Sequence, residues 1–188
     1  IPRRQRQMCI RDRSFKGDRW FRIYYPFDNH KKSFLNMESR EFKPFGSVSA
    51  LTLGGGGIGN VWGETSKEES IASVHLALES GIDHLDVAPM YGKGEAERVV
   101  GEAIKERSRD SFRLTTKCAL GSMPDEEVYD RFNTSLIRSL DTMGTDYVDL
   151  FLLHSQLIEN DHESQKPDSS FVATGNLTTL KSCLLYTS

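Results

Sequence analysis

The segment Ile82-Asp-His-Leu-Asp-Val87 has the short, β-rich composition of a buried strand, and a loop that passes through Tyr91 follows it. In the next stretch Ala96, Val100 and Ile104 recur at every fourth residue, which places apolar side chains on one face of a helix. A strand, a loop and a helix in this order make one βα unit. This unit is the reference from which we interpret the rest of the chain.

The same unit is predicted on both sides of this segment. Before it, a helix that starts at Ser66 carries Glu69 three residues later, the spacing of a capping box, and Gly81 supplies the stop. The expected elements are strands at 49–54, 82–87, 112–117 and 147–153 and helices at 66–80, 96–104 and 125–143. Strands that alternate with helices predict a parallel sheet of an α/β protein.

The overall composition selects no macromolecular partner. The 188 residues are 37% hydrophobic and 27% charged, with a formal net charge of −3. This balance exerts no long-range attraction on nucleic acid or anionic membranes, so we expect neither as a partner. No apolar run reaches the roughly 18 to 20 residues that span a bilayer, and we expect a cytoplasmic protein.

The cysteines indicate neither a disulfide framework nor a metal site. Cys9, Cys118 and Cys183 are odd in number and have no Cys-x-x-Cys spacing. We expect Cys118 to be a buried, apolar-like residue near the end of a strand. No metal ligands are assigned.

Four polar residues stand where the predicted strands end. Asp86, Lys117 and His154 end or follow the second, third and fourth strands, and Tyr91 lies just past Asp86. The carboxyl ends of parallel strands meet at one edge of the sheet, where the active sites of α/β barrels are built. We therefore expect these four side chains to lie in one site.

This set of residue types suits proton transfer to a carbonyl group. When hydride reaches the carbon of an aldehyde or ketone, negative charge develops on the oxygen, and an acid must protonate or hold that oxygen. Tyrosine, with an ordinary pKa of about 10, becomes a better acid beside an ammonium group. Lys117 could provide that charge, with Asp86 as its partner, and His154 could orient the substrate.

Three segments resemble the aldo-keto reductase family in the same order along the chain. They are His84-Leu-Asp-Val-Ala-Pro-Met-Tyr-Gly-Lys-Gly-Glu-Ala-Glu97, Thr115-Thr-Lys117 and Asp146-Tyr-Val-Asp-Leu-Phe-Leu-Leu-His154. The resemblance runs from about residue 41 to about residue 156. Val87 departs from it, because many members have threonine at this position.

The resemblance implies a (β/α)₈ TIM barrel, of which about the first four βα units are present. It also implies an oxidoreductase that reduces small carbonyl compounds, with Tyr91 as general acid, Asp86 and Lys117 tuning it, and His154 orienting the carbonyl. NADP(H) is the cofactor that the resemblance favours, and NAD(H) stays open because the residues that choose between them belong to later strands. We expect the four units alone to be inactive. The oligomeric state stays open.

The glycine-rich loop Gly54-Gly-Gly-Gly-Ile-Gly59 supports a rival interpretation. It matches the Gly-x-Gly-x-x-Gly pattern of Rossmann dehydrogenases, and Asp86 would then bind a ribose. A Rossmann loop opens directly into a helix, however, and here residues 60–65 intervene. We interpret Gly55, Gly56 and Asp86 as cofactor contacts in a barrel. A third alternative is a non-catalytic barrel that binds cofactor and regulates a partner.

The two ends of the chain do not follow the βα pattern. Residues 4–13 and 182–188 resemble translated adaptor sequence, and Met37 opens a stretch that would suit a natural start. We expect residues 1–36 to be a non-native or upstream segment, residues 37–181 to be the amino-terminal part of the barrel domain, and residues 182–188 to be an artefactual tail. Residues after 155 are expected to form a long loop.

Overall fold

The structure, a computed structural model, describes residues 9–10, 21–22, 37–43, 45–120, 123–158 and 172–174. The chain divides into two compact units, Ile1–Phe34 and Leu35–Ser188. In the first unit, β1 (Cys9–Ile10) pairs antiparallel with β2 (Phe21–Arg22). All elements discussed below belong to the second unit.

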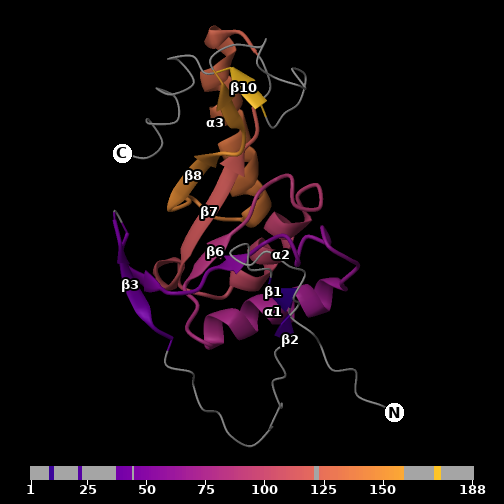
Figure 1. Cartoon of the computed structure of the whole chain (residues 1–188), viewed down its shortest axis with the longest axis vertical. Helices are drawn as coiled ribbons and strands as arrows, with labels where there is room; N and C mark the ends of the chain where they lie inside the picture. The colour runs from indigo at the N-terminus through magenta and orange to yellow at the C-terminus, as the bar shows by residue number, and fades with distance from the viewer. Residues whose placement is uncertain are drawn as a thin grey trace, which may run out of the picture. The chain divides into compact units, whose positions relative to one another are not determined.

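A four-stranded parallel sheet forms the centre of the second unit (Figure 1). Its strands are β5 (Leu53–Gly54), β6 (His84–Asp86), β7 (Arg113–Cys118) and β8 (Leu150–Leu153). They pair in the order in which they occur in the chain. The predicted parallel sheet is confirmed, and its order has no reversal of the kind at which Rossmann folds bind dinucleotides.

The three predicted helices are present. They are α1 (Lys67–Glu79), α2 (Glu95–Ile104) and α3 (Asp125–Met143). The Ser66 hydroxyl accepts a hydrogen bond from the backbone N–H of Glu69 at 3.2 Å, as an N-cap should. Gly144 ends α3 in the left-handed conformation, with φ of 64°.

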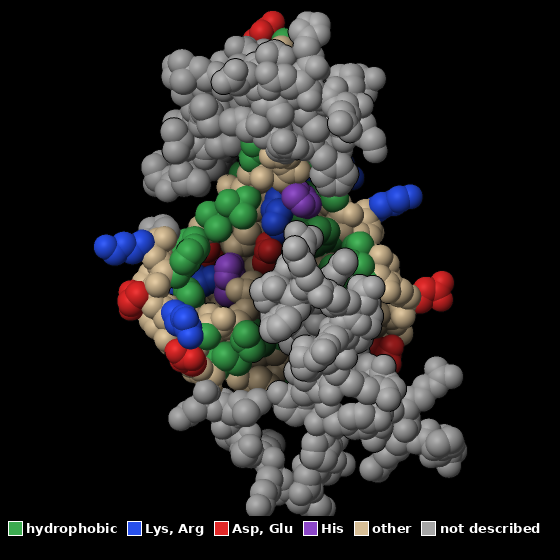
Figure 2. All heavy atoms as spheres, in the orientation of Figure 1, with side chains coloured by type: hydrophobic (Ala, Val, Ile, Leu, Met, Phe, Trp, Pro, Cys, Tyr) green, Lys and Arg blue, Asp and Glu red, His purple; other side chains and the backbone are tan. Residues whose placement is uncertain are grey.

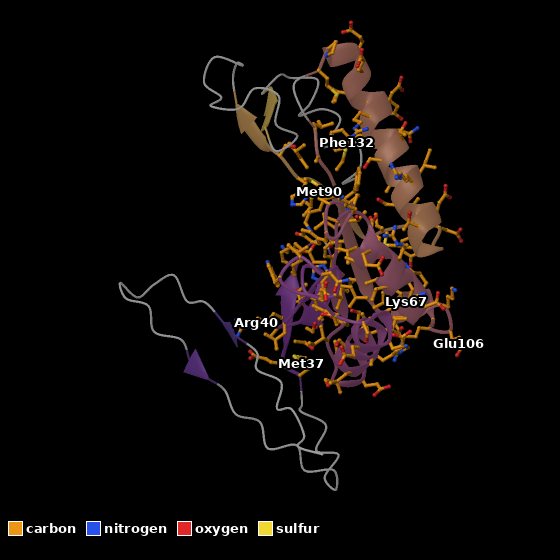
Figure 3. All side chains as sticks on the ribbon, turned by 90° about the vertical axis from the view of Figure 1, so that its right-hand side faces the viewer. Met37, Arg40, Lys67, Met90, Glu106 and Phe132 are labelled. Carbon is orange, nitrogen blue, oxygen red and sulfur yellow. The ribbon has the colours of Figure 1, made fainter. Side chains whose placement is uncertain are left out.

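The helices are held to the sheet by two apolar clusters. Val99 and Val100 of α2 are fully buried in the first cluster together with Leu85 and Leu114 of the sheet. In the second cluster Phe132 of α3 contacts Phe151 of β8 edge to face, with ring centroids 5.7 Å apart. Figure 3 shows Phe132 on the side of α3 that faces the strands. The helical periodicity seen in the sequence therefore marks the buried faces.

The amino-terminal part of this unit differs from the prediction. Residues 49–54 were expected to form one strand, but β4 (Gly46–Ser49) pairs antiparallel with β3 (Ser39–Phe42), and only Leu53–Gly54 join the parallel sheet. The end of this hairpin is joined to the residue before β6 by a pair of hydrogen bonds between Ser49 and Asp83. The Ser49 N–H donates to Asp83 Oδ1 at 2.8 Å, and the Asp83 N–H donates to Ser49 Oγ at 3.0 Å. The hairpin is thereby fastened beside the start of β6.

Further differences concern the ends of strands and the segments between elements. The second strand is confined to residues 84–86 and the fourth to residues 150–153, and a 3₁₀ turn, η1 (Arg109–Ser111), precedes β7. After His154 the expected long loop instead contains β9 (Gln156–Ile158), which pairs parallel with β10 (Val172–Thr174). Residues 182–188 lie outside the described residues, and the expected boundaries at residues 36 and 181 stay predictions.

Candidate active site

The four predicted catalytic residues come together at the carboxyl edge of the sheet. Asp86 is the last residue of β6, Lys117 is the second-last residue of β7, and His154 follows β8 directly. Tyr91 lies in the loop between β6 and α2; its chain neighbour Met90 is at the opposite end of the strands from Met37 (Figure 3). Figure 2 shows basic, acidic and histidine side chains gathered on one face, with hydrophobic side chains around them.

Lys117 and Asp86 form an ion pair that is buried mainly on the lysine side. The ammonium group donates one hydrogen bond to Asp86 Oδ1 and another, 2.9 Å long, to the backbone carbonyl of Val87. The lysine side chain is 10% exposed and that of the aspartate 34%. A buried ammonium group needs such partners, because burial without them carries a large desolvation cost. The cation is thus held in place, while the carboxylate still reaches the surface.

Tyr91 contacts both the lysine and the histidine of this cluster. The Lys117 Nζ atom is 4.9 Å from the centroid of the Tyr91 ring. The Tyr91 ring also packs edge to face against the His154 ring, with the two ring centroids 5.6 Å apart and the ring planes at 88°. The backbone of Tyr91 is fastened at both ends, since its N–H donates to Ala88 and its carbonyl accepts from Ala96. A phenol is thereby presented next to a cation and an imidazole.

His154 is positioned by contacts between the segments that follow β7 and β8. The backbone N–H of His154 donates to the backbone carbonyl of Cys118 at 2.7 Å. The hydroxyl of the neighbouring Ser155 accepts a hydrogen bond from the backbone N–H of Leu120 and donates one to the Leu120 carbonyl. Burial, followed by the positive charge of Lys117, lowers the pKa of His154. The imidazole is therefore neutral near pH 7 and can act as an uncharged hydrogen-bond donor.

The glycine loop has a packing role that the sequence did not reveal. The Gly55 N–H donates to the Asp86 carbonyl at 2.7 Å. A Cβ atom on Gly55 would come within 2.9 Å of Val87 Cγ1 and 3.2 Å of the Tyr91 ring, and one on Gly56 within 2.9 Å of the Trp62 ring. Position 55, which also lies close to the backbone carbonyl of Asp86, thus favours glycine for close approach, whereas the exposed Trp62 ring could move away from a side chain at position 56. The loop turns through residues 55–60 and bends through 61–63, and no helix begins between Gly54 and Lys67, unlike a Rossmann fingerprint.

His84 and Cys118 lie beside the site in other roles. His84 Nε2 is 2.8 Å from the Thr115 hydroxyl, and Nδ1 is 3.1 Å from that of Thr52. Burial lowers the pKa of His84, so this ring also stays neutral near pH 7. Cys118 is buried at the end of β7, as expected, and burial raises the pKa of its thiol. In the described part of the chain no cluster of three or more potential metal ligands occurs.

Sequence reasoning missed the groups that hold the four side chains. The Val87 carbonyl and the Ser155 hydroxyl bond to residues about 30 positions away, and no local pattern announces such partners. Because the lysine uses the carbonyl of Val87, the valine side chain at this position leaves that bond intact.

Among the described residues, no helix has the length and apolar character needed to cross a membrane.

Comparison with known proteins identifies the family. The model of the Aldo/keto reductase family matches residues 50–166, which include all four site residues. This chain belongs to the aldo/keto reductase family. The resemblance stated from the sequence is therefore confirmed.

Related proteins extend this finding. Aldo-keto reductase YhdN of Bacillus subtilis is 39% identical over 114 residues, 57% of this chain and 34% of that protein. The NADH-specific methylglyoxal reductase of Escherichia coli is 31% identical over 125 residues, 59% of this chain and 38% of that protein. The chain thus spans between a third and two fifths of the length of these curated relatives.

Solved structures agree on the fold. The thermostable aldo-keto reductase Tm1743, in complex with the inhibitor epalrestat, has a TM-score of 0.55 at 30% identity, covering 70% of this chain and 46% of that one. An aldo-keto reductase from Klebsiella pneumoniae in complex with NADPH has a TM-score of 0.54 at 28% identity, covering 64% of this chain and 40% of that one. The aldo-keto reductase chain described here is therefore part of a (β/α)₈ barrel, as predicted.

Proposed function

We propose that the complete protein reduces the carbonyl group of small aldehydes or ketones to an alcohol, with Tyr91 as the general acid. The observation that carries this proposal is that the Tyr91 ring lies close to both the Lys117 ammonium group and the His154 imidazole. These groups converge at the carboxyl edge of a parallel sheet, where barrel enzymes place their chemistry.

The surroundings of Tyr91 match the charge that develops during the reaction. Negative charge grows on the carbonyl oxygen, and a nearby cation stabilises negative charge on that oxygen or on the phenol that gives up its proton. Lys117 supplies the cation, and Asp86 with the Val87 carbonyl fixes its position. The neutral His154 can donate an N–H to the same substrate oxygen and so orient it for proton transfer.

The chain's own residues are compatible with a nicotinamide cofactor beside this cluster. The Asp86 carboxylate is one third exposed, and a Cβ atom on neighbouring Gly54 would meet nothing within 4 Å, so the backbone is open there. We assign Asp86, Gly55 and Gly56 as candidate contacts of the cofactor. When bound, the reduced cofactor supplies the hydride. The NADPH complex of the Klebsiella pneumoniae structure favours NADP(H), while the name of the Escherichia coli relative keeps NAD(H) as the alternative.

The open sheet supports the further expectation that residues 37–181 are inactive by themselves. Within the described residues, β5 and β8 each have one neighbour in the parallel sheet, β6 and β7 respectively. Parallel strands with unpaired edges are prone to associate with other chains. We therefore place all activity tests in the complete protein.

The test is oxidation of NADPH by a panel of small aldehydes and ketones, followed at 340 nm with the complete protein. Tyr91→Phe should lower kcat by about a thousandfold, within the usual range for a general acid, and leave the Kd for NADPH within a few fold. Tyr129→Phe is the matched control, because this tyrosine is 48% exposed on α3, and it should keep the wild-type kcat.

Two outcomes would contradict the proposal. Full activity of Tyr91→Phe would remove Tyr91 as the acid. Tight binding of NADPH without oxidation by any carbonyl in the panel would instead favour the non-catalytic, cofactor-binding alternative.

A further inference from the structure

A buried carboxylate lies outside the four catalytic residues, on the helix that follows Tyr91. Glu97 in the first turn of α2 is only 3% exposed, and Thr116 on β7 is fully buried. The Thr116 hydroxyl donates a hydrogen bond of 2.7 Å to Glu97 Oε1. Burying a carboxylate costs free energy, so the buried Glu97 side chain needs a hydrogen-bond partner at this position. An apolar side chain on α2 would fill the same space without that cost.

The hydrogen bond joins the two segments that carry the acid and its lysine. Thr116 immediately precedes Lys117, and successive side chains of a strand point to opposite faces, so Thr116 meets α2 while Lys117 meets Asp86. At the other end of the bond, Glu97 follows Ala96, whose N–H donates to the Tyr91 carbonyl at 3.2 Å. A short chain of contacts thus runs from the backbone of Tyr91 to that of Lys117.

We propose that Glu97 and Thr116 are a positioning pair that sets the separation of Tyr91 from the Lys117 ammonium group. Val99 and Val100 of α2 share an apolar cluster with Leu114 of β7, and such apolar contacts are non-directional. The hydrogen bond adds direction, because it requires the start of α2 to stay in one register along β7. This inference rests on the proposed role of Tyr91 as the acid.

The main test uses the double variant E97L/T116V of the complete protein. It removes both polar groups together, so no buried carboxylate is left without a partner and the fold should persist. A displacement of a reacting group by about 1 Å can cost roughly a hundredfold in rate. We expect kcat to fall between about tenfold and a hundredfold, with KM for NADPH within threefold, and a larger solvent isotope effect on kcat because proton transfer has become slower.

Conservative variants that keep the hydrogen bond serve as controls. Thr116→Ser keeps the hydroxyl donor and Glu97→Gln keeps a carbonyl acceptor, so both should retain kcat within about threefold and the wild-type isotope effect. A residue pair that only stabilises the fold would lower the melting temperature in E97L/T116V without changing the isotope effect or kcat of the folded enzyme.

The outcomes separate this inference from the proposed function. If Tyr91→Phe is inactive but E97L/T116V keeps the wild-type kcat and isotope effect, the positioning role is wrong and the acid assignment stands. If E97L/T116V shows the expected loss while Thr116→Ser and Glu97→Gln keep kcat within about threefold, the positioning role is supported. If Tyr91→Phe is fully active, the proposed function fails first and the positioning role fails with it.

Discussion

Each end of the parallel sheet holds a partly buried ion pair, and the surroundings of the two pairs differ. At the carboxyl edge, Lys117 pairs with Asp86. At the amino edge, Arg109 pairs with Asp149, with N–O distance 2.5 Å and side-chain exposures of 19% and 14%. Both join residues more than 30 positions apart. Their surroundings differ in how much of the charge stays accessible.

The amino-edge pair is enclosed by structural partners. The Arg109 guanidinium group also donates to the carbonyls of Phe112 and Tyr147, and it stacks on the Tyr147 ring at 3.8 Å. Asp149 Oδ2 in turn accepts the N–H of Leu114 at 2.8 Å. Planar guanidinium groups are suited to such multiple, fixed contacts. The pair fastens the turn before β7 to the start of β8.

The carboxyl-edge pair keeps part of its charge available. Asp86 is one third exposed, and the lysine lies beside the ring of Tyr91. Lysine is a compact charge on a flexible stem, which suits interaction with a group whose charge changes during a reaction. The two pairs therefore differ in their accessible neighbours and not in the ion pair itself, and this difference supports the proposal that the carboxyl edge is the functional edge.

The largest effect should come from removing the cation at the carboxyl edge. Lys117→Met in the complete protein should lower kcat about a thousandfold, because Tyr91 loses the charge that supports proton donation. The free energy of unfolding of this variant should change little, since the Asp86 carboxylate that loses its partner can be hydrated at the surface. Lys105→Met, on an exposed helix pair, is the control. A kcat within threefold of wild type in Lys117→Met would erase the functional distinction between the two edges.

The opposite pattern is expected at the amino edge. Asp149→Asn should lower the free energy of unfolding by about 3 kcal/mol, as measured by urea denaturation, because Arg109 keeps its charge in a poorly hydrated place. The kcat of the folded enzyme should stay within twofold. Glu102→Gln, which breaks the exposed pair with Lys105, should have little measurable effect on stability. Loss of activity without loss of stability in Asp149→Asn would contradict the assignment.

The smallest effect concerns acid sensitivity at His84, the first residue of β6. Burial lowers the pKa of His84, so below its ordinary value of about 6.5 the unfolded chain binds more protons than the folded one. The free energy of unfolding therefore decreases as pH falls through this range. His84→Gln should make the decrease between pH 7 and pH 5 shallower in urea denaturation. An identical pH slope in wild type and variant would show that His84 is not a source of acid sensitivity.

Elements with a long, regular apolar period were predictable. The bounds of α3 coincide with the predicted 125–143, and α1 follows its Ser66 cap, because a helix is specified by contacts within a few residues. The structure of the segment 49–54 was not predictable, since an alternating pattern suits either a parallel strand or a hairpin strand. Here residues 46–49 belong to the hairpin, whose end is joined to Asp83 by the hydrogen bonds of Ser49.

For the site, the sequence by itself determined which residue types end the strands, and hence that Asp86, Lys117 and His154 share one edge with Tyr91. This follows from chain direction alone, because parallel strands place their carboxyl ends together. Only the tertiary structure decided what each side chain contacts. The bonds of Lys117 to Val87, of Ser155 to Leu120 and of Thr116 to Glu97 join segments 19 to 35 residues apart. Such partners depend on helix placement and strand register, which local sequence patterns do not encode.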